Sequence, residues 1–314
     1  MEKENKTAHT GALLMARVTE FLEFLEVQKG ASENTIDAYS TDLRQWCHFV
    51  EKEMIEWENS DQKDLFGFII WLQEQTGISR RTQARKISAV KALYQYLERT
   101  DQIEKNLIRK TRAPRYKRGL PKPIRPIELE ELLEGETEQK KKIQVRDQAL
   151  MELLYSSGMR ISEALSLRVS DLCDESGGVH SECRVIGKGK KERIVFIGSR
   201  AKEVLKQYIA VYRSKLHNEG PLFLNYNGRP LTRQGAVYIL KQRRISRNID
   251  QNVTPHSFRH SFATDMLNEG ADIRMVQEML GHTSVSTTQN YTRVALDRLK
   301  NTFWTAHPHA KKRD

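Results

Sequence analysis

A basic stretch interrupted by proline and glycine divides this chain into two unequal parts. Residues 110–126 read KTRAPRYKRGLPKPIRP and include no acidic residue. Proline fixes φ and removes a backbone hydrogen-bond donor, so a continuous helix cannot run through this stretch. We therefore predict an extended connector at 110–126 with a folded part on each side. A chain of 314 residues is long enough for two domains, each with a core of its own.

The net charge of the chain is +11, and much of the excess lies in the connector. Such a charge attracts polyanions over long range and makes the affinity for nucleic acid depend on salt. Composition does not separate DNA from RNA or from a membrane surface. The connector is either a solvated linker or a strap across a phosphate backbone. The connector residues that we assign to phosphate contact are Lys110, Arg112, Arg115, Lys117 and Arg118.

Residues 13–109, which follow a polar extension at 1–12, show apolar residues at helical spacing. We predict four helices, beginning near residues 13, 32, 63 and 79. The last of them, capped by Ser79, places Ile87, Val90 and Leu93 toward a core. A basic end on such a helix suits contact with a phosphate backbone or a groove. The basic residues in its first turns are Arg80, Arg81, Arg85 and Lys86.

Residues 127–314 form the second part, which begins with an apolar helix around Ala149 to Leu154. Gly158 ends this helix, and Arg160 follows at the turn into the next. Arg160 is either a surface residue paired with Glu163 or a cation held rigidly for function. Further on, helices are expected at 199–216 and from Thr232, with a short strand and turn at 221–231 between them.

The hydrophobic period changes to two at residues 183–186 and 193–197, which predicts a β-hairpin. The two runs are joined by GKGKKE, which places Lys188 in a glycine-bearing turn. Lysines in turns are ordinarily solvated. A flexible turn is equally suited to bring an ammonium group to a bound DNA strand.

The stretch from Val253 to Thr292 combines residue types suited to a phosphoryl group. Thr254 and Pro255 begin a helix that places His256 and Arg259 on one face. An imidazole and a guanidinium directed at one point can bind the two non-bridging oxygens of a phosphate. A second helix with Ile273, Val276, Met279 and Leu280 on one stripe ends at Gly281, before His282, and Tyr291 follows. Taken singly, each of these residues also fits a solvated face or ordinary packing.

The ordered segments HSFRH, LGHTS and STTQNYT, with SSGMRISEAL upstream, resemble the catalytic signature of tyrosine recombinases, most of all the Xer type. The resemblance implies a mainly α-helical fold with a small β-hairpin, in which a helical core-binding domain and an α+β catalytic domain form a two-domain DNA clamp. It implies that Glu163 supports the first catalytic arginine. The catalytic residues that it implies are Arg160, Lys188, His256, Arg259, His282 and the nucleophile Tyr291.

The implied reaction is cleavage and rejoining of DNA through a 3′-phosphotyrosyl intermediate. The sequence contains no Asp/Glu cluster with metal-ligand spacing, no GK[ST] phosphate loop and no zinc pattern. We therefore expect neither a metal nor a cofactor, and cations of the protein would stabilise the transition state.

The Xer resemblance implies resolution of chromosome or plasmid dimers during cell division. The implied partners are a specific double-stranded DNA site, a homo- or heterotetramer of recombinase subunits, and a DNA translocase activator such as FtsK. A phage or transposon integrase of the same family is the alternative. Less favoured are a type IB topoisomerase and a catalytically silent DNA-binding protein. Asn290 before the tyrosine, and HTSVS after Gly281, depart from common Xer patterns, so the paralogue stays open.

Two further observations concern the compartment. Cys47, Cys173 and Cys183 have no disulfide or zinc-ligand spacing. No apolar run approaches the length of a membrane span, and the amino terminus has no signal-peptide core. We expect a soluble cytoplasmic protein without membrane contact.

The tail after Tyr291 carries an apolar stripe of Leu296, Leu299 and Phe303 on a predicted terminal helix. A patch of this size is unusual on a soluble surface. Folding back on its own domain is one alternative. The family resemblance instead implies that this C-terminal helix docks on a neighbouring protomer, and docking is what we expect.

Overall fold

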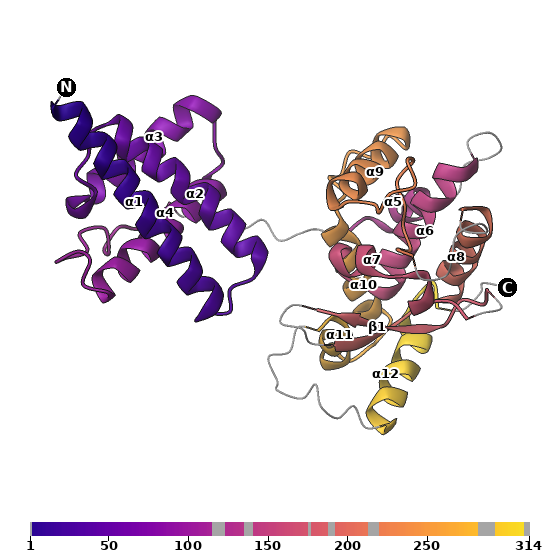
Figure 1. Cartoon of the computed structure of the whole chain (residues 1–314). Helices are drawn as coiled ribbons and strands as arrows, with labels where there is room; N and C mark the ends of the chain where they lie inside the picture. The colour runs from indigo at the N-terminus through magenta and orange to yellow at the C-terminus, as the bar shows by residue number, and fades with distance from the viewer. Residues whose placement is uncertain are drawn as a thin grey trace. The chain divides into compact units, whose positions relative to one another are not determined.

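The computed structural model describes residues 2–114, 123–134, 141–174, 177–187, 192–212, 220–281 and 293–310. The chain forms two compact units, Met1–Gly119 and Leu120–Asp314 (Figure 1). The described residues are mainly helical with one two-stranded antiparallel sheet, which confirms the predicted fold class. In the same residues no helix is long and apolar enough to cross a membrane.

The first unit is a cluster of helices around an aromatic core. Its described elements are α1 (Glu2–Val27), α2 (Glu33–Lys52), the 3₁₀ helix η1 (Trp57–Asn59), α3 (Gln62–Thr76) and α4 (Arg80–Arg99). The Trp46 ring of α2 lies edge-on to Phe68 of α3 and Tyr94 of α4, with centroids 5.3 and 6.2 Å apart. The Tyr94 hydroxyl donates to the carbonyl of Trp57 at 2.8 Å, so its buried polar group is satisfied. These rings join the helices into one core.

Local signals account for both ends of α3 and for the start of α4. Asp61 forms a capping box with Asp64 at the start of α3, and Gly77 ends that helix in the left-handed conformation. The Ser79 hydroxyl accepts from the backbone N–H of Thr82, as predicted for the start of α4. Helix α1 begins at Glu2 and therefore includes most of the polar stretch at 1–12. The helix runs through Gly11, where α1 passes close to α2: an added Cβ would lie 3.2 Å from the Glu51 side chain.

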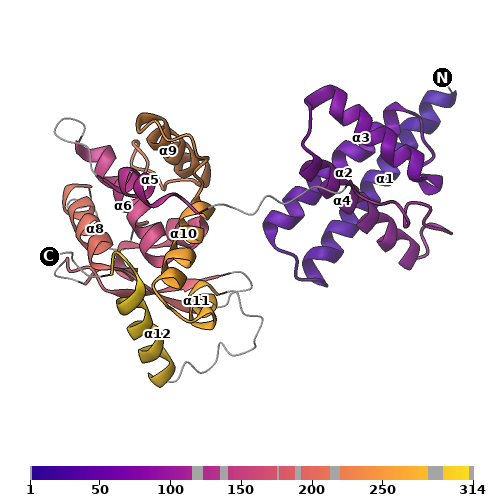
Figure 2. The ribbon, with the colours of Figure 1, turned by 180° about the vertical axis from the view of Figure 1, so that it is seen from behind.

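The second unit is a larger helical layer structure with a β-hairpin on one side. Its described elements are α5 (Pro126–Leu133), α6 (Lys141–Ser157), α7 (Ile161–Ser166), the 3₁₀ helix η2 (Val169–Asp171), β1 (Glu182–Ile186), β2 (Glu192–Phe196), α8 (Ser199–Tyr212), α9 (Arg233–Ser246), α10 (Pro255–Asn268), α11 (Ile273–Leu280) and α12 (Arg293–Ala306). Helix α6 is central, with α8 and α10 packed along it (Figures 1 and 2). Residues 149–159 are all buried, as expected of a helix surrounded by others.

The β-hairpin contributes one face to the core. Cys183 pairs with Val195, and Val185 pairs with Arg193. All four side chains are buried, so a charged residue shares the inward face with three apolar ones. The short strand predicted at 221–231 is reduced to isolated bridges at Pro221 and Leu224. The turn after Leu224 is closed by the Asn225 N–H, which donates to the Arg229 carbonyl at 2.7 Å, and the Leu231 N–H donates to the Phe223 carbonyl at 2.9 Å.

Helix α12 folds back on its own unit, which is the first of the two alternatives for the tail. Leu299 and Phe303 are buried in a cluster with Phe196 of β2, Phe262 of α10 and Leu280 of α11. The segment beyond α12 continues along α6. The backbone N–H of Ser199 donates to the Ala310 carbonyl at 2.9 Å. The terminal segment is therefore part of the core of this unit.

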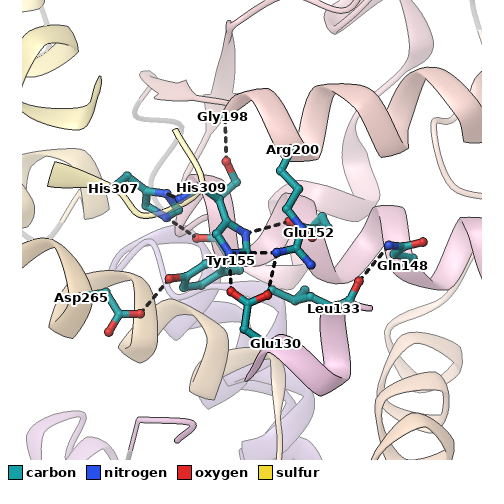
Figure 3. Close-up of polar contacts among 11 residues, drawn as sticks. Glu130, Leu133, Gln148, Glu152, Tyr155, Gly198, Arg200, Asp265, His307 and His309 are labelled. Atoms are coloured by element: carbon teal, nitrogen blue, oxygen red, sulfur yellow. Dashed lines mark hydrogen bonds and ion pairs between the residues drawn. The ribbon is translucent and has the colours of Figure 1, made fainter. Parts of the chain in front are cut away.

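A polar cluster anchors that terminal segment (Figure 3). His309 lies between Glu130 of α5 and Glu152 of α6, with ring nitrogens 3.0 and 3.2 Å from their carboxylate oxygens. The Arg200 side chain of α8 pairs with the same two carboxylates at 2.6 and 2.7 Å. His307 is fully surrounded, stacked on Phe303 and next to Tyr155. Charges on three helices thus converge on the last described turn.

Candidate active site

Arg160 is positioned by the way in which α6 ends. Gly158 adopts φ +60°, and any Cβ there would lie 2.6 Å from the Phe262 ring. Only glycine fits such a position without strain. The chain then turns so that Arg160 becomes the N-cap of α7, where its backbone N–H donates to Glu163 Oε2 at 2.6 Å. The Arg160 side chain stays 38% exposed, so its guanidinium is within reach of a ligand.

Glu163 lies beneath Arg160 and joins it to a second arginine. Its carboxylate is 3% exposed and accepts from Arg160 Nη1 at 2.9 Å. Arg193 of β2 donates to both oxygens of the same carboxylate, at 2.7 and 2.8 Å. Burial raises the pKa of the Glu163 carboxyl, but the hydrogen bonds and charges of Arg193 and Arg160 outweigh burial and bring that pKa below its ordinary value. Glu163 is therefore ionised at neutral pH.

Arg259 enters the site from α10. That helix begins as predicted, with Thr254 capping the N–H of Ser257 and Pro255 in the first turn. The Arg259 side chain is buried and donates to the carbonyl of Gly158 at 2.8 Å and to the carbonyl of Leu280. It therefore ties α10 to the ends of α6 and α11. The last carbonyls of a helix carry its negative dipole end, which suits a guanidinium.

The end of α11 is held by two arginines. Arg193 Nε donates to the Met279 carbonyl at 3.0 Å, next to the Leu280 carbonyl that Arg259 contacts. Gly281 then ends the helix in the left-handed conformation, as predicted. On α11 the stripe of Val276, Met279 and Leu280 is buried. Ile273, predicted to share the stripe, is exposed because it occupies the first helical position, at the rim of the unit.

His256 lies at the surface of α10, one turn before Arg259. Partial burial, followed by the positive charges of Arg259, His260 and Arg160, lowers the pKa of the imidazole below its ordinary value. The ring is therefore neutral at pH 7, which is the form that accepts a proton. His256 precedes Arg259 by one helical turn, and Arg259 contacts the Gly158 carbonyl beside the turn that carries Arg160, so positive charges lie close to the imidazole.

The site carries an excess of positive charge. Burial, followed by repulsion from Arg160 and Arg193, lowers the pKa of Arg259 to about 9, and Glu163 offsets this only in part. Three arginines surround a single carboxylate, so a bound anion would relieve the repulsion. Preorganised cations of this kind stabilise the negative charge that develops in a phosphoryl-transfer transition state.

The structure brings together Arg160, Glu163, His256 and Arg259 of the predicted site. Lys188, His282 and Tyr291 lie outside the described residues. Among those described, no group of three or more His, Cys, Asp or Glu side chains forms a metal site.

Arg193 is the site residue that sequence reasoning missed. It stands at an inward position of β2, with the parity of Val195, where the alternation calls for an apolar residue. A charge at such a position must be paired to be buried. A charged residue at an inward position of the predicted strand was the available signal. Its partner, Glu163, lies 30 residues away in the sequence, so the pairing could not be predicted from the strand itself.

The residues predicted to contact phosphates in the first unit fall into two groups. Arg80, Arg81 and Arg85 are exposed, although Arg85 also pairs with the buried Asp42 at 2.5 Å. The prediction for Lys86 is wrong, because Lys86 is 3% exposed and its ammonium lies 2.6 Å from Asp42. It neutralises a carboxylate inside the helical cluster. Of the connector residues, Lys110 and Arg112 are exposed. Arg115, Lys117 and Arg118 lie outside the described residues.

Known proteins resemble this chain over nearly its whole length. A family profile described as "Phage integrase family" matches residues 122–298, and one described as "Phage integrase, N-terminal SAM-like domain" matches residues 18–101. The tyrosine recombinase XerC of Leptospira interrogans is 38% identical over 293 residues, covering 93% of each chain. The tyrosine recombinase XerD of Oceanobacillus iheyensis is 40% identical over 304 residues, covering 95% of this chain and all of that one.

Solved structures show the same fold. XerH recombinase, in a post-cleavage complex with a palindromic difH substrate, aligns with a TM-score of 0.65 at 24% identity, over 91% of this chain and 84% of that chain. The Tn1549 transposon integrase in complex with circular-intermediate DNA aligns with a TM-score of 0.64 at 18% identity, over 91% and 98%. Family profiles, relatives and fold agree, so the chain belongs to the phage integrase family of tyrosine recombinases and is a site-specific DNA recombinase.

Proposed function

We propose that this recombinase cuts and rejoins duplex DNA through a 3′-phosphotyrosyl intermediate and resolves chromosome or plasmid dimers when a cell divides. The observation that carries the chemical part is geometric: Glu163 holds the Arg160 guanidinium at 2.9 Å, and Arg259 binds the Gly158 carbonyl, two residues before Arg160, at 2.8 Å. His256 lies one turn before Arg259 on the same helix. The relatives named XerC and XerD, at 38% and 40% identity, favour dimer resolution over the integrase alternative.

In the proposed reaction the Tyr291 hydroxyl attacks the scissile phosphorus. The bond from phosphorus to the 5′ oxygen breaks, and the 3′ phosphate is left on the tyrosine. His256, neutral at pH 7, accepts the phenolic proton. Lys188 donates a proton to the leaving 5′ oxygen. Attack by another 5′ hydroxyl reverses the step, and the phosphodiester energy is conserved in the covalent link.

Arg160, Arg259 and His282 would stabilise the negative charge of the transition state. Removal of one such donor typically slows a reaction by about 10²–10³-fold. Neither a metal nor a nucleotide cofactor takes part in the proposed reaction.

We further propose that the two units clamp the duplex and that four subunits, identical or of two kinds, act on paired sites in the cytoplasm. A translocase such as FtsK would activate them. Arg80 and Arg81 are exposed at the first turn of α4, where a helix end can meet a phosphate backbone. XerH, which shares the fold, is described bound to difH substrate. The exposed Lys110 and Arg112 add charge near the end of the first unit.

A covalent-trapping assay tests the chemistry. The binding site is first located by footprinting across the replication terminus of the host chromosome, and a nicked suicide duplex with that site is then incubated with the protein. The wild type should give an adduct that survives detergent. Tyr291→Phe should give none while binding the duplex within about 3-fold of the wild type, because the lost hydroxyl is the nucleophile.

Tyr226, an exposed tyrosine in a turn, supplies the matched control. Tyr226→Phe should form the adduct at the wild-type rate. An adduct formed by Tyr291→Phe would mean that another residue is the nucleophile.

The role of Lys188 is tested on a duplex with sulfur in place of the bridging 5′ oxygen. A thiolate leaves without a proton, so Lys188→Ala should be slow on the normal duplex and recover most of the rate on the sulfur duplex. Equal defects on both duplexes would exclude Lys188 as the acid, and selective recovery of Lys190→Ala would transfer the role to Lys190.

A further inference from the structure

Arg193 makes contacts that no substrate-binding role explains. Its side chain is 6% exposed and lies between α7 and α11. All three guanidinium nitrogens donate to described partners, two to Glu163 and one to the Met279 carbonyl. The guanidinium is therefore used inside the protein and not offered to a ligand.

The first of these contacts determines how Glu163 holds Arg160. Glu163 Oε1 accepts from Arg193 Nη1 at 2.7 Å and from Arg160 Nη1 at 2.9 Å. Glu163 Oε2 accepts from Arg193 Nη2 at 2.8 Å and from the Arg160 backbone at 2.6 Å. A two-point contact from a planar guanidinium fixes the plane of the carboxylate. The same carboxylate plane then sets the direction of the Arg160 side chain.

The second contact determines where the chain leaves α11. Arg193 Nε donates to the Met279 carbonyl. A Cβ added at Gly281 would lie 3.1 Å from Arg193 Cδ. Gly281 therefore lies directly against the arginine stem. Arg193 thus holds the last turn of α11, directly before His282 in the sequence.

We propose that Arg193 is a positioning residue for strand cleavage, which holds Arg160 through Glu163 and holds the end of α11, where Arg259 also binds, through the Met279 carbonyl. This inference rests on the proposed role of Arg160 as a phosphate ligand. Arg193 does not touch DNA. It acts by keeping Arg160 and the end of α11, to which Arg259 is bound, in a fixed relation. A misplacement of about 1 Å in a group that binds the phosphate can cost on the order of 100-fold in rate.

A buried ion pair with a purely structural role is the competing explanation, since breaking any such pair destabilises a fold. Arg146 offers a matched comparison, because it is buried on α6, pairs with Asp147 at 2.5 Å and donates to the Leu224 carbonyl at 3.2 Å. Arg193→Gln and Arg146→Gln should both lower the melting temperature. Only Arg193→Gln should slow cleavage, by about 100-fold at saturating duplex, with half-site binding kept.

A substrate with a neutral phosphate separates the two explanations, because a loss of protein stability would slow cleavage of the normal and the neutral duplex equally. A methyl group in place of one non-bridging oxygen removes a charge that Arg160 would neutralise. The defect of Arg160→Ala should therefore shrink on the methylphosphonate duplex. If Arg193 acts through Arg160, the defect of Arg193→Gln should shrink to a similar degree, and the double variant should cleave no more slowly than Arg160→Ala alone.

Arg193→Lys guards against a folding failure, since it keeps the charge and loses the two-point contact. It should melt closer to the wild type and still cleave more slowly on the normal duplex. Two results would overturn the proposal. One is an equal defect of Arg193→Gln on both duplexes. The other is a double variant whose defect equals the product of the two single defects. The Tyr291→Phe comparison, run on the same gels, tests the proposed function independently of these outcomes.

Discussion

The Arg259 guanidinium donates a hydrogen bond to the Gly158 carbonyl oxygen at 2.8 Å, and so joins α10 to the last turn of α6. Gly158 is also the residue that turns the chain toward Arg160. The carbonyl of this left-handed glycine binds Arg259, and the turn that the glycine makes places Arg160 at the start of α7. Both arginines are proposed phosphate ligands. The two arginines come from elements about 100 residues apart, and this contact keeps them together.

Replacement of Gly158 by alanine should damage both folding and cleavage. The left-handed backbone costs about 1 kcal/mol for alanine, and the added Cβ would lie 2.6 Å from the Phe262 ring, which adds about 1–3 kcal/mol of overpacking. We expect a loss of roughly 2–4 kcal/mol in the free energy of unfolding, measured by urea denaturation. Gly177→Ala is the control, because Gly177 has φ +81° but no atom within 4 Å of its Cβ position. Equal losses in the two variants would show that the contact with Phe262 is unimportant.

The basic residues of α4 should separate into one group that binds DNA and one that stabilises the fold. Arg81→Ala removes an exposed charge, so duplex affinity should fall and the salt slope should drop by about 1 at unchanged stability. Lys86→Met leaves the buried Asp42 with fewer partners and should cost about 3 kcal/mol of unfolding free energy. Gel-shift titrations at several salt concentrations, beside thermal melts, measure both effects. Weaker binding by Lys86→Met with an unchanged melt would return Lys86 to the DNA contacts.

Truncation after Arg298 should destabilise the second unit. It removes Leu299 and Phe303 from the core, and it removes the terminal segment with His309. Loss of two large buried side chains alone costs about 5 kcal/mol or more, so the melting temperature should fall sharply. A chain that stops after Ala310 is the control and should melt like the full protein. If the shorter chain melts normally, α12 does not pack on its own unit in solution, and docking on a neighbouring protomer is favoured.

Gly198→Ala tests the same packing with the whole chain present. An added Cβ at Gly198 would lie 2.2 Å from the His309 carbonyl oxygen, so the terminal segment must move away. Gly198 is not among the glycines with positive φ, and alanine brings no backbone strain there. The melting temperature should therefore fall, as is expected for the truncation.

Acid should destabilise the second unit through His307. Burial, followed by repulsion from His309, lowers the pKa of His307 to about 3. The unfolded chain binds a proton near pH 6.5 and the folded chain does not, so stability is complete above pH 6.5 and is lost as pH falls toward 3. The loss contributed by this group approaches about 1.4 kcal/mol per pH unit inside that window.

Thermal melts between pH 7.5 and 5 measure this effect. Tyr155 of α6, Phe262 of α10 and Phe303 of α12 surround the ring, and the imidazole of His309 lies next to it. His307→Gln should be less stable at pH 7.5 but show a shallower loss toward pH 5. An equally steep loss in this variant would assign the acid sensitivity to other groups.

Several features of the fold were predictable from the sequence because the signals that specify them are local. Ser79, Thr254 with Pro255, and Gly281 start or end helices through hydrogen bonds and backbone conformations within a few residues of themselves. The hairpin followed from its period-two runs. The order of HSFRH, LGHTS and STTQNYT pointed to the family without knowledge of any contact.

Tertiary structure alone decided which charges are buried and what they hold. In the sequence, Lys86 looks like one more basic residue at a helix end. In the structure, its ammonium pairs with Asp42 of another helix. In the sequence, Arg193 is only a residue of a predicted strand. In the structure, it donates hydrogen bonds to Glu163 and to the Met279 carbonyl. The apolar stripe of α12 was visible in the sequence, but the surface that covers it was not. A buried charge or an apolar face is stabilised only by partners brought close in space, and those partners lie tens of residues away along the chain.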